Sequence, residues 1–191
     1  MSKTKAELRQ FYLSKRKELA PGQLQQLSEQ ISDLIFTHFQ LEEKYVSLFL
    51  PIERQHEINT YRIWEKAIEF GAKVAVPKSN FETMEMKHIL FESEDQLELS
   101  AWGIPEPKKG KVIAADRFDY VFVPMITADK KGNRVGYGKG FYDKFLKKCA
   151  PNCQFIGLYL FDIESKIEDK HPGDVRLHAC ITPHGLIRFE K

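Results

Sequence analysis

Residues Val121–Leu146 read VFVPMITADKKGNRVGYGKGFYDKFL, and this segment decides the fold. Its apolar start, which stops at Pro124, predicts a buried strand, and helical spacing begins at Phe141. Between them lie a polar turn and three glycines on alternate positions, Gly136, Gly138 and Gly140. A strand, a glycine-rich loop and a helix in this order turn backbone N–H groups and a helix N-terminus towards an anion. We therefore predict an anion-binding loop in this segment.

The charged side chains of the same loop favour phosphate as the anion. Arg134 and Lys139 are cations, and Asp143 is a carboxylate suited to a metal ion. Neither standard nucleotide loop is present, because Asn133 occupies the first glycine position of a P-loop and Phe141 the third glycine position of the dinucleotide fingerprint. The alternative is a tight turn that binds nothing, since glycine marks special backbone geometry more often than a ligand.

Length and composition indicate one soluble domain, residues 1–191. The chain is 42% hydrophobic and 12% aromatic, which is enough for a sizeable core. Because 29 Lys and Arg stand against 27 Asp and Glu, there is no basic excess of the kind that indicates nucleic-acid binding. The N-terminus is charged and no apolar run is long enough to span a membrane. Three cysteines without a C-x-x-C pair indicate a reducing compartment, so we expect a cytoplasmic monomer that binds neither nucleic acid nor membrane.

Strands and helices alternate along the chain, which predicts an α/β fold. Two helices come first, over residues 3–19 and 24–38. A strand over residues 45–50, a helix that ends near Gly71 and a strand over residues 73–76 follow through short links. This βαβ unit implies a parallel sheet with a right-handed crossover. Further strands are expected at residues 84–91, 120–123, 155–160, 179–181 and 186–189, whereas Trp102–Pro107 is too rich in proline for regular structure.

The ends of the predicted strands point to one crevice. In open α/β sheets ligands gather beyond the carboxyl ends of the strands, and two of these ends are Leu50-Pro51 and Val123-Pro124. We therefore expect Glu57, which follows the first end, to face the glycine loop, which follows the second. Lys5 and Arg9 are four residues apart and share one face of the first helix, but spacing alone favours two solvent-facing charges.

With these residues in place, the chain resembles the 5-formyltetrahydrofolate cyclo-ligase (5,10-methenyltetrahydrofolate synthetase) family. The main resemblance is Asn133–Asp143, NRVGYGKGFYD, which is close to the family signature R-L-G-x-G-K-G-Y-Y-D. Three further segments resemble family elements in the same order along the chain. Lys5–Arg9 is similar to K-x-x-L-R, Glu57–Thr60 to E-I/V-x-T, and Gly103–Pro107 to the I-x-E/Q-P element.

The resemblance implies a three-layer α/β sandwich, with a mainly parallel central sheet flanked by helices and an N-terminal helical pair. It also implies ATP- and Mg²⁺-dependent conversion of 5-formyltetrahydrofolate to 5,10-methenyltetrahydrofolate, with release of ADP and phosphate. By position, the expected ATP contacts are Lys5, Ala6, Glu7, Leu8, Arg9, Arg134, Val135, Gly136, Tyr137, Gly138, Lys139, Gly140, Phe141 and Tyr142. The expected folate contacts are Arg9, Leu50, Glu57, Tyr137, Gly138, Lys139, Gly140 and Phe141. Mg²⁺ is assigned to Asp143 and Asp174.

The resemblance also implies a chemical route. The formyl group at N5 is an amide and a poor electrophile, so its oxygen is expected to attack the γ-phosphate of ATP, after which N10 closes the ring and phosphate leaves. Positioning and charge neutralisation serve phosphoryl transfer, so Lys139 and Arg134 are the expected catalytic residues. Glu57 suits the N–H groups of the pterin. The aromatic residue that stacks on the pterin stays open among Phe49, Trp102 and Tyr137.

Two other functions stay open at this point, another ATP-dependent small-molecule phosphotransferase and a non-catalytic folate- or nucleotide-binding module. Intact Lys139 and Asp143 speak against the second. The chain departs from the family pattern at a few positions: Val135 and Phe141 replace Leu and Tyr, and His178 and Pro183 replace acidic residues.

Overall fold

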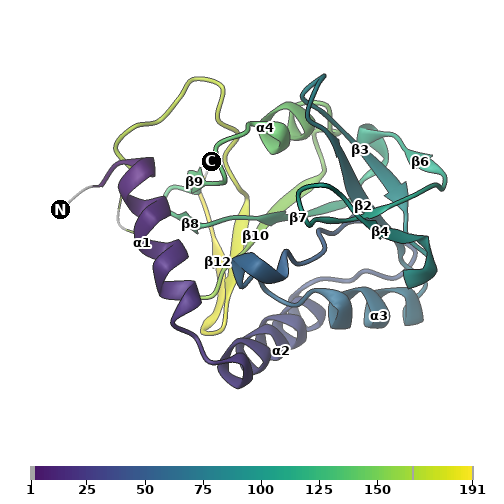
Figure 1. Cartoon of the computed structure of the whole chain (residues 1–191), viewed down its shortest axis with the longest axis horizontal. Helices are drawn as coiled ribbons and strands as arrows, with labels where there is room; N and C mark the ends of the chain where they lie inside the picture. The colour runs from purple at the N-terminus through teal and green to yellow at the C-terminus, as the bar shows by residue number, and fades with distance from the viewer. Residues whose placement is uncertain (1–2, 165, 191) are drawn as a thin grey trace.

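The computed structural model describes residues 3–164 and 166–190, and its centre is an eight-stranded sheet (Figure 1). The strands, in spatial order, are β12 (Gly185–Arg188), β11 (Ala179–Thr182), β10 (Gln154–Leu158), β7 (Tyr120–Pro124), β1 (Tyr45–Ser47), β2 (Lys73–Asn80), β3 (Glu85–Leu90) and β6 (Val112–Ile113). The strands from β11 to β2 pair in parallel, whereas β12, β3 and β6 pair antiparallel with their neighbours. The prediction of a mainly parallel sheet is confirmed.

The position of β7 explains why its sequence is continuously apolar. Val121, Phe122 and Val123 are fully buried, although successive side chains of a strand point to opposite faces. Phe122 packs into one core cluster with Ile156, and its two neighbours pack into a second cluster with Phe155. A strand buried on both faces loses the alternation of polar and apolar residues, so the apolar run marks a central strand.

Helices cover both faces of the sheet. They are α1 (Lys5–Lys17), α2 (Pro21–His38), α3 (Tyr61–Glu69) and α4 (Phe141–Leu146). Ile35 of α2 and Ile63 of α3 pack in the first core cluster, and Leu8 of α1 and Phe145 of α4 pack in the second. Figure 1 shows α2 and α3 together along one side of the sheet and α4 on the opposite side. The predicted three-layer α/β sandwich with an N-terminal helical pair is confirmed.

The N-terminal helices begin at defined caps. The Thr4 hydroxyl accepts the N–H of Glu7 and the Glu7 carboxylate accepts the N–H of Thr4, which forms a capping box at α1. Pro21 is the first residue of α2, where its missing N–H costs no intrahelical bond, so this helix begins before Leu24. No helix in the described part of the chain combines the length and the apolar composition that a membrane crossing requires.

Short ribbons and turns extend from the central sheet. β8 (Thr127–Ala128) pairs with β9 (Arg134–Val135), and β4 (Leu97–Leu99) pairs with β5 (Pro105–Pro107). Short 3-10 helices are η1 (Glu53–Gln55), η2 (Glu94–Gln96) and η3 (Ala115–Arg117). The expectation that Trp102–Pro107 lacks regular structure is therefore wrong for its second half. Proline is tolerated there because β5 lies in a small ribbon, outside the central sheet.

A buried histidine lies on the face of the sheet that α4 covers. His88 is 1% exposed, its Nε2 lies 2.8 Å from the Ser47 hydroxyl oxygen, and its ring stacks on Phe145 with 4.0 Å between centroids. Burial lowers the pKa of His88 to about 3. The ring therefore stays neutral in the folded protein far into the acid range.

We expect the buried His88 to make the stability of the folded protein sensitive to acid. Its folded pKa lies below the value of about 6.5 expected for the unfolded chain, so the unfolded chain binds the proton preferentially. The stabilisation is complete above the unfolded pKa and is lost as the pH falls towards the folded one, by about 2 kcal/mol between pH 7 and pH 5. Urea unfolding of the wild type and of His88→Gln at several pH values measures this loss.

We expect a flatter pH dependence in His88→Gln, even though loss of the ring lowers its overall stability. Replacement of the exposed His38 by Gln serves as the matched control and should leave the slope unchanged. Equal slopes in wild type and His88→Gln would show that this histidine does not carry the acid sensitivity.

Candidate active site

The β8–β9 hairpin fixes the start of the glycine loop. Its turn is built on Asp129, which is fully buried and whose carboxylate accepts the N–H groups of Asn133 and Ile167. The turn also requires a glycine, because Gly132 has a φ of 76° and a Cβ there would lie 2.8 Å from the Leu177 carbonyl oxygen. Hydrogen bonds and steric fit thus hold the hairpin in place before the loop begins.

Two of the three alternate glycines have backbone conformations that other residues rarely adopt. Gly138 has a φ of 83°, and Gly140, with a φ of 73°, caps α4. A Cβ at Gly138 would lie 3.4 Å from Nη2 of Arg9, so the loop also passes close to α1. A tight turn explains these glycines but not the charges around them. The helix that follows has only six residues, so an anion at this loop would be bound by loop amides and side chains rather than by a helix terminus.

Helix α1 turns two cations towards this loop. Arg9 Nε donates to the Gly136 carbonyl oxygen at 2.9 Å, and Lys5 Nζ lies 2.5 Å from Oδ2 of Asp174. The expectation from spacing that both charges face solvent is wrong. A four-residue interval shows that two residues share a helix face, but it does not show what packs beside that face, and here β8 and β9 do.

Arg134 and Asp143 form a second ion pair. Arg134 Nη2 lies 2.8 Å from Asp143 Oδ1, and the Arg134 side chain is 7% exposed. The Val175 N–H donates to the same carboxylate oxygen at 2.9 Å, and the Val175 carbonyl accepts a bond from Arg134. This double contact brings Asp174 beside the pair. Although burial opposes it, the hydrogen bond from Lys5 holds the pKa of Asp174 below its usual value.

The two carboxylates fit the predicted magnesium site. Asp143 uses only Oδ1, and Asp174 only Oδ2, for hydrogen bonds within the described ranges, so each keeps one oxygen for another partner. Mg²⁺ prefers oxygen ligands and often takes one or two carboxylates together with water and substrate phosphate. Across residues 3–164 and 166–190, no group of three or more His, Cys, Asp or Glu side chains gathers that could hold a metal. Ligand phosphate would have to complete the coordination.

Glu57 approaches the glycine loop from the end of β1. Its side chain is buried, its Oε1 accepts the Tyr137 hydroxyl at 2.5 Å, and its Oε2 accepts the Ile52 N–H at 2.8 Å. The prediction that Glu57 and the loop face one another is confirmed. Burial raises the pKa of Glu57, and the hydrogen bond from Tyr137 and the charge of Arg16 oppose the rise. Leu50 packs in the core cluster of α2 and α3, so its folate contact stays a prediction.

The other predicted ligand residues differ in whether their side chains already have partners within the protein. The side chain of Lys139 is exposed and has no ion pair or hydrogen bond with a described residue. The Tyr142 hydroxyl is buried without a hydrogen-bond partner in the described ranges, and burial together with the charge of Glu57 raises the pKa of Tyr142. An unsatisfied buried hydroxyl is a group that a ligand can engage. Glu7 serves the capping box and Leu8 packs in the core, so ATP contacts at Ala6–Leu8 stay predictions.

Arg16 is a site residue that the sequence reasoning missed. It is 2% exposed, and it donates from Nη1 to the Tyr137 hydroxyl at 3.2 Å and from Nη2 to the Met125 carbonyl. A signal was present, because Leu8, Tyr12 and Arg16 follow at four-residue intervals. A cation that continues an apolar helical stripe points to a buried polar contact.

An aromatic edge borders the loop. The ring of Phe81 lies 5.2 Å from that of Trp102 and 5.2 Å from that of Phe141, measured between centroids. Trp102 is 54% exposed, whereas Phe49 is buried and the Tyr137 hydroxyl is bonded to Glu57. Among the three aromatics considered for stacking on a pterin, Trp102 therefore has the most accessible ring.

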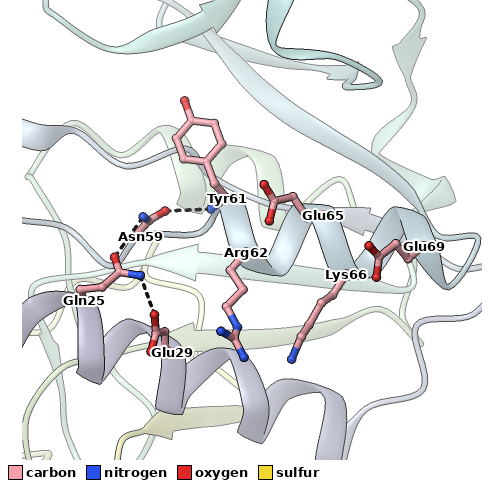
Figure 2. Close-up of a pocket in the computed structure, with 8 residues that line it drawn as sticks. All are labelled: Gln25, Glu29, Asn59, Tyr61, Arg62, Glu65, Lys66 and Glu69. Carbon is pink, nitrogen blue, oxygen red and sulfur yellow. Dashed lines mark hydrogen bonds between the residues drawn. The ribbon is translucent and has the colours of Figure 1, made fainter.

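An open groove of about 530 Å³ lies elsewhere, between α2 and α3 (Figure 2). Figure 2 shows Gln25 between Asn59 and Glu29, to which it is hydrogen bonded. The two cations of the groove, Arg62 and Lys66, both pair with Asp33. None of the predicted site residues lines this groove, so it is separate from the candidate active site.

Comparison with known proteins finds relatives that cover most of the chain. Residues 1–160 match the model of the 5-formyltetrahydrofolate cyclo-ligase family. The chain is 27% identical to the 5-formyltetrahydrofolate cyclo-ligase of Escherichia coli K12 over 177 residues, which cover 88% of this chain and 94% of that protein. It is 30% identical to the mouse enzyme of the same name over 128 residues, which cover 63% of this chain and 62% of the mouse protein. The aligned part thus spans less than two thirds of the mouse protein.

A solved structure is also similar. The NMR structure of Aquifex aeolicus 5,10-methenyltetrahydrofolate synthetase superposes with a TM-score of 0.83 at 25% identity. The superposition covers 98% of this chain and 93% of that one. Nearly all of the fold described above is therefore shared with that protein.

Proposed function

The chain belongs to the 5-formyltetrahydrofolate cyclo-ligase family, and on this premise we propose that it cyclises 5-formyltetrahydrofolate to 5,10-methenyltetrahydrofolate with ATP, releasing ADP and phosphate. One observation carries the proposal: a single loop, residues 134–143, reaches Glu57 through Tyr137 in its middle and pairs Arg134 with Asp143, its first and last residues. One ten-residue segment thus contacts a carboxylate suited to a pterin and also carries a charged site suited to phosphate. Relatives named for this reaction support the same conclusion.

The proposed reaction activates an amide oxygen. The formyl oxygen at N5 attacks the γ-phosphorus of ATP, the bond to the ADP oxygen breaks, and N5 shares its lone pair to give a phosphorylated iminium. N10 then attacks the formyl carbon and loses its proton, and the carbon–oxygen bond breaks to release phosphate. The product keeps the formyl carbon as the bridge between N5 and N10.

Cations near the loop would neutralise the charge that moves during phosphoryl transfer. Lys139 is exposed and unpaired within the described residues, so it is available to the transferred group, and Arg134 lies at the base of the loop. Lys5 and Arg9 add positive charge from α1. A fixed cation is worth most where water is excluded, as at the buried Arg134. This placement supports the proposed catalytic roles of Lys139 and Arg134.

Asp143 and Asp174 would hold Mg²⁺, which when bound supplies charge neutralisation to the nucleotide phosphates. Each carboxylate keeps one oxygen outside the hydrogen bonds of the described chain. The cations that pair with them now, Arg134 and Lys5, are the ones proposed to meet phosphate. This shared set supports joint binding of metal and nucleotide.

Glu57 would bind the pterin. Both of its oxygens already accept one bond, and each keeps a lone pair for an N–H group of the ring. The exposed Trp102 supports stacking at the rim. We also propose that the protein is a monomer and that it is cytoplasmic. The free thiols of Cys149, Cys153 and Cys180 support the second part, because they favour a reducing compartment.

The deciding assay follows the absorbance of 5,10-methenyltetrahydrofolate together with phosphate release. With protein, 5-formyltetrahydrofolate and Mg·ATP, both products should appear in equal amounts, and omission of ATP should abolish both. A phosphorylated acceptor without methenyl product would instead identify a phosphotransferase. Ligand binding without turnover of ATP would identify a binding module.

Lys139→Ala should lower kcat by about a hundredfold or more, as expected for loss of a preorganised charge beside the transferred group. Lys148→Ala removes the same charge from an exposed position just beyond α4 and should leave kcat unchanged. Steady-state kinetics of the two variants at saturating ATP make the comparison. Near-normal turnover of Lys139→Ala would remove Lys139 from the mechanism.

Glu57→Gln should raise the KM for 5-formyltetrahydrofolate by about tenfold or more, because a neutral amide replaces a charged acceptor of two N–H bonds. The KM for ATP should change little, since the hydrogen bonds of Glu57 go to Tyr137 and Ile52 and not to Lys5 or Asp174. Separate titrations of the two substrates test this. An effect confined to ATP would contradict the assignment.

A further inference from the structure

Arg16 carries a buried charge without a carboxylate in direct contact. Its terminal nitrogens reach the Tyr137 hydroxyl and the Met125 carbonyl, and its Nε has no hydrogen-bond partner among the described residues. Burial of a guanidinium without a nearby negative charge is costly. The carboxylate of Glu57, on the far side of the Tyr137 hydroxyl, is the negative group that compensates the charge of Arg16.

The chemistry of the three groups fixes the direction of the bridge. Arginine only donates hydrogen bonds and an ionised carboxylate only accepts them. The Tyr137 hydroxyl must therefore accept from Arg16, at 3.2 Å, and give its single proton to Glu57, at 2.5 Å. The bridge is strongest when Glu57 is ionised, because a carboxylate accepts a stronger hydrogen bond from the Tyr137 hydroxyl than a neutral carboxyl does.

Burial and the bridge have opposite effects on the pKa of Glu57. Burial raises the pKa of Glu57, while the Tyr137 hydroxyl, the charge of Arg16 and the Ile52 N–H lower it. From α4, Tyr142 lies within electrostatic range and contributes a neutral hydroxyl. Arg16 is thus the cation that acts on this carboxylate, and it acts across the hydroxyl of Tyr137.

We propose that Arg16 is a positioning residue for the folate end of the site, which through Tyr137 keeps the Glu57 carboxylate ionised and in one orientation for the pterin N–H groups. The inference rests on the proposed function, which supplies the pterin as the ligand of Glu57. Arg16 itself does not touch the ligand. Helix α1 then serves both substrates, with Lys5 beside Asp174, Arg16 one side chain away from Glu57, and Arg9 at the Gly136 carbonyl between them.

A titration of the ligand-free protein tests the bridge directly. In protein labelled with ¹³C-glutamate, the carboxyl signal of Glu57 is identified by its loss in Glu57→Gln and followed by NMR against pH. In Arg16→Met its midpoint should rise by about one pH unit or more, because a favourable charge is removed while burial stays. Arg16→Lys, which keeps the charge, should show a smaller rise. Lys17→Met removes a charge from an exposed position on the same helix and should show none.

Kinetics supply a second readout that a purely structural role would not move. A higher Glu57 pKa leaves the carboxylate protonated over a wider pH range, so the acid limb of kcat/KM for folate should move to higher pH in Arg16→Met. At neutral pH the folate KM should rise by about tenfold, and the ATP KM should stay within about twofold. In a Glu57→Gln background, Arg16→Met should add little, because the two changes remove the same interaction.

The titration and the kinetics each either support or overturn the proposed role of Arg16. An unchanged Glu57 midpoint in folded Arg16→Met, or equal effects on the two KM values, would overturn it. If Arg16→Met does not fold by circular dichroism, Tyr137→Phe, which removes only the bridging hydroxyl, is titrated instead; a raised midpoint supports the bridge and an unchanged one overturns it. The titration needs no substrate, so a wild type without methenyl product would overturn the proposed function and leave the bridge to be judged by NMR alone.

Discussion

The buried carboxylate of Asp129 is the contact on which the candidate site depends most. It ties the turn of the β8–β9 hairpin to the C-terminal segment through the N–H groups of Asn133 and Ile167. The Leu177 N–H adds a bond to the Gly132 carbonyl, beside the crowded Cβ position of that glycine. The segment that carries Arg134 and Asp143 is thereby held against the one that carries Asp174. A buried carboxylate is stable only when its oxygens are satisfied, so this junction forms as a unit or not at all.

This junction brings the charged side chains of the proposed phosphate site together as ion pairs. Lys5 pairs with Asp174 and Arg134 pairs with Asp143, so these four charges balance one another in the ligand-free protein. A ligand that carries both phosphate and a divalent cation can exchange partners with each pair, phosphate with the cations and metal with the carboxylates. Phosphate alone would leave two partly buried carboxylates unpaired, which is unfavourable. With the proposed function, these pairs would favour a metal–nucleotide complex over either component.

Patterns in the sequence predicted most of the fold because the central strands are buried on both faces. The apolar run at Val121–Val123 and the βαβ unit were sufficient for the parallel sheet, and the resemblance to a family supplied its layers. Contacts between distant segments were harder, since spacing shows which residues share a face but not what covers it. Lys5 and Arg9 were expected in solvent for that reason, and Arg16 was missed because its partners lie in the glycine loop and at Met125. The resemblance to a family supplied roles for Lys5 and Arg9, whereas only the structure revealed Arg16.

The Tyr137 hydroxyl between Arg16 and Glu57 leaves the carboxylate more capacity for a ligand than a direct ion pair would. A guanidinium that binds a carboxylate side by side occupies both oxygens, and Glu57 would then have less capacity for a ligand. With Tyr137 between them, the carboxylate receives one bond on Oε1 and one from Ile52 on Oε2, and a lone pair stays free on each. The cation still stabilises the ionised form, because charge acts over this distance in a buried site more strongly than in water. Placement of the charge one side chain away from the carboxylate thus reconciles two demands on Glu57, that it stay ionised when buried and that it stay open to a ligand.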